Sequence, residues 1–330
     1  MTLLSVDNLT VTLKTVRGPA RAVRNLSFEL KKGETLGIVG ESGCGKSLTA
    51  LAIMGLLPEN GWADGGISLG GQNLLDYSED QMCRVRGDRI GMVFQEPMTS
   101  LNPLHTVGKQ IAEAMILHRG MAKGEARKEV LRLLDLVGIP QPAKRIGNYP
   151  HQLSGGQRQR VMIAMALSCG PELLIADEPT TALDVTIQKQ ILDLIKGLIE
   201  DLGMAMILIS HNLGVISQNV KDVIVMYGGA QVEGGPTKKV FSDLSHPYSQ
   251  GLFSAVPQID DTKASRNRLT TIPGTVPELA DLPAGCTFQD RCTYVSEACR
   301  PTPPPVVQVS KGHEVACLHT EAARAAWTVR

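Results

Sequence analysis

The chain has 330 residues, of which 43% are apolar and 20% are charged. This composition is typical of a folded globular protein and excludes a collagen-like or disulfide-scaffold chain. Its 33 basic and 33 acidic residues balance, so no excess of positive charge favours binding to nucleic acid. At roughly 150 residues per domain, the length predicts one large domain and a smaller one.

The chain has no apolar stretch of the roughly 18 to 20 residues that a membrane-spanning helix requires. Its N-terminal segment, MTLLSVDNLTVTLK, alternates apolar and polar residues as a strand does and lacks the basic and apolar regions of a signal peptide. We therefore expect a cytoplasmic protein that does not cross a membrane by itself.

Short apolar runs alternate with helical patterns along most of the chain. This alternation predicts an α/β fold with a mostly parallel sheet covered on both faces. Residues 106–138 are charged and helical in pattern, which indicates a helical subdomain inserted between two halves of the sheet domain. The predicted strands are Glu34–Gly40, Ile90–Phe94, Leu173–Asp177, Met204–Ser210 and Asp222–Tyr227, and the predicted helices are Lys46–Leu57, Val185–Leu202 and a segment after Ser154.

The strongest local motif matches G-x-x-x-x-G-K-[ST] and follows the first of these predicted strands. Glycines let backbone N–H groups surround phosphate oxygens, while the lysine reaches the terminal phosphates and the hydroxyl is offered to Mg²⁺. Cys44 occupies a variable position of the motif, and we interpret it as tolerated there and not as a reactive thiol. The predicted phosphate loop consists of Gly40, Glu41, Ser42, Gly43, Cys44, Gly45, Lys46 and Ser47.

Two adjacent carboxylates, Asp177 and Glu178, end the apolar run LLIADE. Ligands of open α/β sheets bind at the carboxyl ends of the strands. With a phosphate loop upstream, Asp177 is expected to hold Mg²⁺, directly or through water. Glu178 is expected to act as a general base, or at least to orient the water that attacks the γ-phosphate.

The character of the chain changes after Gln258, where polar residues and then prolines accumulate, so we expect a second domain from residue 257. Four of the seven cysteines lie in it, with a C-x5-C-x6-C-x17-C spacing. Disulfides are improbable in a reducing compartment, which leaves metal or cluster ligation. Neither arm has the C-x2-C spacing of a zinc ribbon. The residues concerned are Cys286, Cys292, Cys299 and Cys317.

Together with Leu153–Gln157 (LSGGQ), the order of these motifs over about residues 1–256 resembles the ATP-binding cassette ATPases. In that family the signature binds the nucleotide held by the opposite subunit, so the resemblance implies a dimer in which Ser154, Gly155, Gly156 and Gln157 face the partner's ATP. It also implies a P-loop NTPase core at 1–256, with an antiparallel β subdomain and a helical subdomain at about 99–157. A small C-terminal domain at 257–330 bears the cysteines.

The resemblance assigns further residues one by one. Gln95 resembles the loop glutamine that senses Mg²⁺ and the attacking water, Asp184 the aspartate at the dimer contact, and His211 the switch histidine on the γ-phosphate. Many members place an aromatic ring under the adenine, but residues 13–18 contain none. We expect Val16 or Arg17 to take that role.

Three further segments are similar to the ATPases of the dipeptide/oligopeptide (and nickel) permeases, and within them to the dipeptide permease subunit. They are Phe94–Pro103, Tyr149–Gln152 and His246–Tyr248. In those subunits four tail cysteines bind a [4Fe-4S] cluster, and all four positions are matched here. Zinc and unligated buried thiols are the alternatives.

The resemblance implies an ATPase that powers import of di- or oligopeptides, or of a related small solute. Its expected partners are a second ATPase chain, expected to differ from this one, two transmembrane permease subunits and, indirectly, an extracytoplasmic solute-binding protein. It would act as a peripheral protein on the cytoplasmic face of the cell membrane. One alternative, a soluble cassette ATPase of DNA repair or the ribosome, predicts a long coiled-coil insertion or two cassettes with a basic surface. A regulatory cassette predicts loss of Glu178 or His211, and both residues are present.

Overall fold

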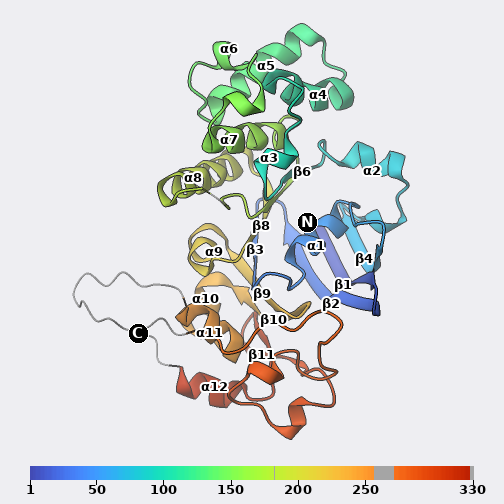
Figure 1. The fold of residues 1–330 in the computed structure, drawn as a ribbon, viewed down its shortest axis with the longest axis vertical. Helices are drawn as coiled ribbons and strands as arrows, with labels where there is room; N and C mark the ends of the chain where they lie inside the picture. The colour runs from blue at the N-terminus through green and yellow to red at the C-terminus, as the bar shows by residue number, and fades with distance from the viewer. Residues whose placement is uncertain (182, 256–270, 328–330) are drawn as a thin grey trace, which may run out of the picture. The chain divides into compact units, whose positions relative to one another are not determined.

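A computed structural model describes residues 1–181, 183–255 and 271–327 (Figure 1). The chain forms two compact units. The first comprises Met1–Leu4, Leu30–Glu34 and Leu69–Ile209, and the second comprises Ser5–Glu29, Thr35–Ser68 and the chain from Ser210 onward. The predicted domain boundary at 256/257 lies outside the described residues and stays a prediction.

Strands and helices are interspersed along the chain, which Figure 1 colours from the N-terminus to the C-terminus. The strands are β1 (Thr2–Thr15), β2 (Gly18–Lys31), β3 (Thr35–Val39), β4 (Gly61–Leu69), β5 (Gln72–Asn73), β6 (Ile90–Val93), β7 (Leu173–Asp177), β8 (Ala205–Ser210), β9 (Asp222–Tyr227), β10 (Ala230–Pro236), β11 (Val306–Ser310) and β12 (His313–Ala316). The α-helices are α1 (Lys46–Ile53), α2 (Glu79–Val85), α3 (Pro97–Ser100), α4 (Val107–Arg119), α5 (Lys123–Leu136), α6 (Pro142–Arg145), α7 (Gly155–Ala166), α8 (Val185–Leu202), α9 (Leu213–Asn219), α10 (Thr237–Ser242), α11 (Pro247–Ser254) and α12 (Thr320–Ala326). Four short 3₁₀ segments are Leu74–Asp76, Pro150–Gln152, Gln289–Arg291 and Glu297–Cys299.

Three parallel strands form the sheet of the first unit. β7 pairs with β6 on one side and with β8 on the other, in the register Ile90↔Leu173 and Leu173↔Ala205. Every residue of the three strands is buried, which is expected of a parallel sheet whose two faces are covered. Because the strands run in the same direction, the residues that follow β6 and β7 emerge at the same edge.

Helices fill the segment between β6 and β7. α4 packs against α5 and α7, and α7 also contacts β6 (Figure 1). The described residues of this segment contain no strand, so the prediction of an inserted helical subdomain is confirmed. In the described part of the chain, no helix is both long and apolar enough to cross a membrane.

The sheet of the second unit combines parallel and antiparallel pairs. β3 and β9 are parallel, whereas β10 is antiparallel to β9 and to β12, and β11 is antiparallel to β12. Gly228 and Gly229, both with positive φ, form the turn between β9 and β10. The β11–β12 hairpin of the cysteine-bearing tail therefore continues the sheet that contains the strand of the phosphate loop.

β1 lies between β2 and β4 in a separate sheet, which has the order β2-β1-β4-β5. Only two residues, Val16 and Arg17, connect β1 to β2. Two adjacent strands joined by so short a turn must be antiparallel, since a parallel pair requires a long crossover. The predicted antiparallel subdomain is thus present.

The predicted strands and helices agree with β3, β6, β7, β8, β9, α1, α7 and α8 to within a few residues at their ends. The prediction gave no bounds for β2, β4, β5, β10 or the β11–β12 hairpin. β10 (AQVEGGP) is rich in glycine and ends in proline, and both residues are depleted in strands. The pairing with β9 and β12 therefore decides its conformation.

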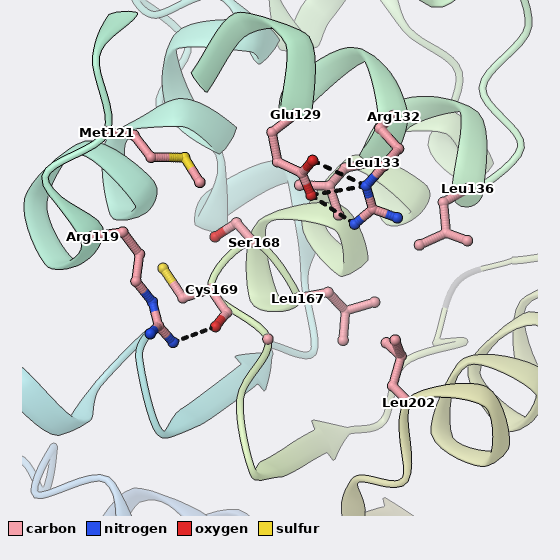
Figure 2. A pocket seen from close by; sticks show the side chains of 11 residues that line it. Arg119, Met121, Glu129, Arg132, Leu133, Leu136, Leu167, Ser168, Cys169 and Leu202 are labelled. Atoms are coloured by element: carbon pink, nitrogen blue, oxygen red, sulfur yellow. Dashed lines mark hydrogen bonds and ion pairs between the residues drawn. The ribbon is translucent and has the colours of Figure 1, made fainter. Parts of the chain in front are cut away.

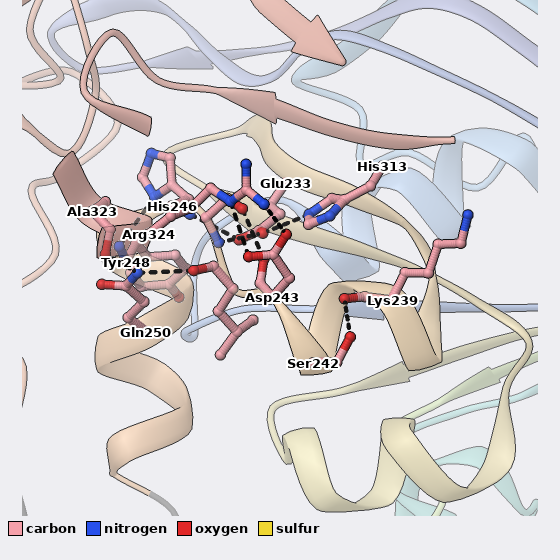
Figure 3. Close-up of polar contacts among 12 residues, drawn as sticks. Glu233, Lys239, Ser242, Asp243, His246, Tyr248, Gln250, His313, Ala323 and Arg324 are labelled. Carbon is pink, nitrogen blue, oxygen red and sulfur yellow. Dashed lines mark hydrogen bonds and ion pairs between the residues drawn. The ribbon is translucent and has the colours of Figure 1, made fainter. Parts of the chain in front are cut away.

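A buried polar cluster joins β10, α11 and β12 (Figure 3). The Glu233 carboxylate accepts hydrogen bonds from the backbone N–H groups of Ser245 (2.8 Å) and His246 (3.1 Å), and its other close partner is His313 Nε2 at 2.8 Å. Glu233 and His313 are fully buried. The cluster therefore links the tail hairpin to the cassette, because breaking it would leave buried polar groups unpaired.

His246 caps α11 from this cluster. Its Nδ1 accepts a hydrogen bond from the Tyr248 N–H at 3.1 Å, and burial lowers its pKa to about 3. In the unfolded chain the pKa returns to about 6.5. Below about pH 6.5 the unfolded state therefore binds a proton that the folded state excludes, so acid destabilises the fold.

We predict that His246→Asn, which keeps a capping acceptor but cannot be protonated, reduces the loss of unfolding free energy between about pH 7 and about pH 5. The reduction approaches about 1.4 kcal/mol for each pH unit in this range. Urea unfolding at the two pH values measures it. The exposed His151, changed to Asn, is the matched control. Equal pH dependence in the wild type and His246→Asn would contradict the prediction.

Candidate nucleotide-binding site

The predicted phosphate loop lies between β3 and α1, as the sequence indicates. Gly45 is the N-cap of α1 and has φ 99°. A Cβ at Gly45 would lie 2.5 Å from the Ala22 carbonyl oxygen, and one at Gly40 would lie 2.2 Å from the Met226 carbonyl oxygen. Both positions therefore require glycine, because no side chain fits between the loop and the neighbouring backbone.

The lysine of the motif is held inside the loop. Lys46 is 5% exposed, and its Nζ donates hydrogen bonds to the carbonyl oxygens of Gly40 (2.8 Å) and Glu41 (3.0 Å). Burial raises the pKa of Cys44, and the nearby Lys46 charge only partly opposes this effect. The Cys44 thiol is therefore protonated near neutral pH, which agrees with its interpretation as a tolerated position.

Residues of the tail contact the phosphate loop and the predicted adenine-binding segment, at two points that the sequence did not suggest. Arg291 pairs with Glu41 of the phosphate loop at 2.7 Å. Arg17 donates two hydrogen bonds to Asp281, at 2.6 and 2.9 Å. Because Arg17 is engaged in this way while Val16 is fully exposed, Val16 is the better placed of the two residues to support an adenine.

The first unit brings together two of the predicted catalytic residues. Asp177 is the buried last residue of β7, and Glu178 follows it with φ 46°, a conformation that is rare outside glycine. The Glu178 carboxylate accepts hydrogen bonds from Gln95 Nε2 at 3.3 Å and from Thr181 Oγ1 at 2.9 Å. Such backbone strain often occurs at functional sites, where the surrounding structure maintains it. The sequence carried no signal for Thr181.

The predicted signature forms the start of α7. Ser154 is the N-cap, and its Oγ accepts a hydrogen bond from the Gln157 N–H, while Gln157 Oε1 accepts one from the Ser154 N–H. Ser154 and Gly155 are exposed. The helix N-terminus therefore presents its partial positive charge to solvent, where an anion can bind.

Two remaining predicted residues follow the ends of secondary structure elements. Asp184 caps α8, accepting a hydrogen bond from the Ile187 N–H at 3.0 Å. His211 directly follows β8 and is exposed. The phosphate loop and His211 belong to the second unit, whereas Gln95, Asp177, Glu178 and the signature belong to the first.

The four tail cysteines lie near enough to influence one another. Burial and then the charges of Cys292, Cys286 and Cys299 raise the pKa of Cys317 to about 11. The Cys286 N–H donates to the Cys299 carbonyl oxygen at 2.8 Å, and backbone N–H groups donate to the Sγ atoms of Cys292 (3.4 Å) and Cys317 (3.3 Å). Among the described residues, no three His, Cys, Asp or Glu side chains are arranged to hold a metal ion. The predicted cluster site therefore stays a prediction.

A cavity of about 330 Å³ lies in the helical part of the first unit (Figure 2). Leu133, Leu136 and Leu167 line it with apolar surface. The arginines at its rim are engaged, since Arg119 donates to the Cys169 carbonyl oxygen at 2.7 Å and Arg132 binds Glu129 through two nitrogens. None of the predicted nucleotide-binding residues lines this cavity.

The chain is similar to known transport proteins. The ABC transporter family matches residues 23–181, and the family described as "Oligopeptide/dipeptide transporter, C-terminal region" matches residues 232–299. The oligopeptide transport ATP-binding protein OppD of Salmonella typhimurium is 50% identical over 316 residues, covering 96% of this chain and 93% of its own. OppD of Escherichia coli is 49% identical, with coverage of 96% and 94%.

Solved structures agree as well. The ATP-binding cassette MJ0796, a dimer bound to ADP and Pi, matches with a TM-score of 0.64 and 31% identity over 71% of this chain and 99% of its own. The observed fold is therefore that of an ABC ATPase. Since half of the residues are shared with OppD over nearly the full length of both chains, this chain belongs to the ABC transporter family, among the ATP-hydrolysing subunits of peptide importers.

Proposed function

We propose that this chain binds and hydrolyses ATP to drive import of di- or oligopeptides through separate transmembrane subunits. The observation that carries the proposal is the phosphate loop, in which Gly40 and Gly45 admit no side chain, in a chain that is 50% identical to OppD. The motifs also resemble those of the dipeptide permease subunit, so di- or oligopeptides are the proposed cargo class.

On the phosphate-loop side, the backbone N–H groups of Glu41–Ser47 bind phosphate oxygens and the N-terminus of α1 adds its dipole. Lys46 leaves the carbonyl oxygens that now accept its hydrogen bonds and binds the terminal phosphates. Ser47 offers its hydroxyl to Mg²⁺, and Val16 supports the adenine. His211 contacts the γ-phosphate.

In the first unit, Asp177 and Gln95 supply oxygen atoms, which are the ligands that Mg²⁺ prefers. When bound, Mg²⁺ would neutralise charge on the phosphates. Glu178 takes the proton of the attacking water as a general base. Its hydrogen bonds with Gln95 and Thr181 hold the carboxylate in one orientation, so little reorganisation is needed when water arrives.

A second cassette completes the reaction. Ser154, Gly155, Gly156 and Gln157 bind the γ-phosphate of the nucleotide on the partner cassette, and Asp184 contacts that partner. The exposed helix N-terminus at Ser154 supports this role. ATP closes the two cassettes and hydrolysis reopens them, and this motion drives two permease subunits that receive peptides from an extracytoplasmic binding protein. The chain would therefore act at the cytoplasmic face of the membrane.

The tail cysteines are proposed to hold a [4Fe-4S] cluster, with zinc as the alternative metal. Their thiols influence one another electrostatically, and N–H groups donate to two of the sulfurs. Hydrogen bonds to sulfur are also a feature of iron–sulfur sites. Four cysteines are the type of donor that such a group takes, and the group would serve to tie the tail together.

Lys46→Ala should abolish nucleotide binding, whereas Glu178→Gln should keep it and slow hydrolysis by roughly 100-fold or more, since it removes the base but not the phosphate contacts. Equilibrium binding and steady-state ATPase assays of the assembled complex measure the two effects. Glu200→Gln on the exposed face of α8 is the matched control. Wild-type turnover by Glu178→Gln would exclude the proposed base.

The isolated chain should hydrolyse ATP slowly, and addition of the partner cassette should raise the rate, because the signature serves the opposite nucleotide. The rate per chain, measured against partner concentration with the association state monitored by light scattering, tests this. Full activity in a strictly monomeric preparation would disprove the shared site.

Anaerobically purified protein should be brown and contain iron and acid-labile sulfide in equal amounts. Cys292→Ser should lose both while the protein still binds ATP. Cys83→Ser, which changes an exposed cysteine of the first unit, should lose neither. Stoichiometric zinc without iron would overturn the cluster and leave a structural metal in its place.

A further inference from the structure

Arg291 connects the tail to the phosphate loop. It ends the 3₁₀ segment that precedes Cys292, and its side chain is 5% exposed. Its Nη1 donates to Glu41 Oε2 at 2.7 Å and to the Tyr227 hydroxyl at 3.3 Å, and its Nη2 donates to Glu41 Oε1 at 3.2 Å. Its Nε donates to the Pro273 carbonyl oxygen at 2.9 Å. All three nitrogens are thus engaged, in the two-pronged geometry that arginine forms with a carboxylate.

The ion pair is shielded from water on one side. Burial by itself lowers the pKa of Arg291, but the hydrogen bonds to Glu41 and Tyr227 outweigh this effect and raise it. The guanidinium carbon lies 5.7 Å from the Tyr227 ring centre and 5.9 Å from that of Phe288. Because the arginine is buried and Glu41 is only partly exposed, this pair is stronger than an ion pair on an open surface.

The backbone of Glu41 is held as well. Its N–H donates to the Tyr248 hydroxyl at 2.8 Å. Tyr248 is fully buried and its ring packs against those of Tyr227 (4.7 Å between centres) and Phe288 (5.4 Å). Residues far along the chain therefore fix Glu41 by both its side chain and its backbone.

Glu41 is the second residue of the loop, where its orientation affects the binding of phosphate in two ways. Its carbonyl oxygen accepts a hydrogen bond from Lys46, so a rotation of this peptide changes the path of the lysine. Its carboxylate is a negative charge beside a site for a triphosphate, and without a partner it would repel that ligand. Arg291 neutralises the carboxylate and keeps it on the tail side of the loop.

We propose that Arg291 is a positioning residue of the ATP site: it holds Glu41, and thereby the phosphate loop, in the conformation that accepts the triphosphate, without itself touching the nucleotide. The cassette alone would then lack one part of its nucleotide site, since the tail provides it. This inference rests on the binding of ATP by the loop and is independent of any metal at the cysteines.

The test is a double-mutant cycle on the full-length chain. We would measure the Kd of a trinitrophenyl-ATP probe, and of ATP by competition, without Mg²⁺ so that nothing is hydrolysed. Arg291→Ala should weaken binding about tenfold, and less than about threefold in a Glu41→Gln background, because the carboxylate it neutralises is then absent. Arg291→Lys, which keeps the charge without the fork, should fall between the wild type and Arg291→Ala.

The control is Arg300→Ala, which also changes an arginine beside a tail cysteine. Arg300 pairs with Glu297 at 3.3 Å and both side chains are exposed, so its loss should leave the Kd unchanged. In the assembled transporter Arg291→Ala should raise the KM for ATP and leave kcat near its wild-type value. The thermal unfolding midpoint of each variant reports stability separately.

The outcomes distinguish a positioning role of Arg291 from a purely structural one. The inference would be overturned if Arg291→Ala and Arg291→Lys bound ATP as tightly as the wild type. It would also be overturned if Arg291→Ala lost the same affinity in the wild-type and Glu41→Gln backgrounds, because that result indicates a purely structural role. If Arg291→Ala does not fold, Arg291→Lys with and without Glu41→Gln completes the cycle. If the wild type itself fails to bind the probe, the phosphate-loop function fails and not Arg291 alone.

Discussion

The close approach of backbone to backbone at the phosphate loop is the constraint on which the rest of the site depends. At Gly40 and Gly45 the loop passes so near the carbonyl oxygens of Met226 and Ala22 that any side chain would collide with them. The loop is thereby held between β9 and β2, and its N–H groups are in place before a ligand arrives. This matters energetically, because a loop that is already ordered loses little conformational entropy on binding.

The tail is joined to the part of the cassette that contains the phosphate loop by strand pairing and by a buried charged group. The β11–β12 hairpin continues the sheet beyond β10, and the buried Glu233 binds both the start of α11 and His313 on the hairpin (Figure 3). A buried carboxylate is tolerated only when its oxygens find donors, and here three are present. Arg291 belongs to the same tail and pairs with Glu41, so the segment with the cysteines also contacts the phosphate loop.

The predicted site residues are distributed between the two units. Glu178, strained at φ 46° and held by Gln95 and Thr181, lies in the first unit, whereas the phosphate loop lies in the second.

The sequence by itself determined five strands and three helices of the cassette in their order. It also determined the phosphate loop, the carboxylates after β7 and the signature at the start of α7, because each is a local pattern formed by neighbouring residues. Local pattern could not predict β10 and the tail hairpin, whose pairing overrides weak strand propensity. Nor could it predict the contact of Glu41 with Arg291. The two residues are 250 positions apart, and the sequence around each gives no indication of its partner. Only the tertiary structure, by returning the tail to the sheet of the phosphate loop, brings these two side chains together.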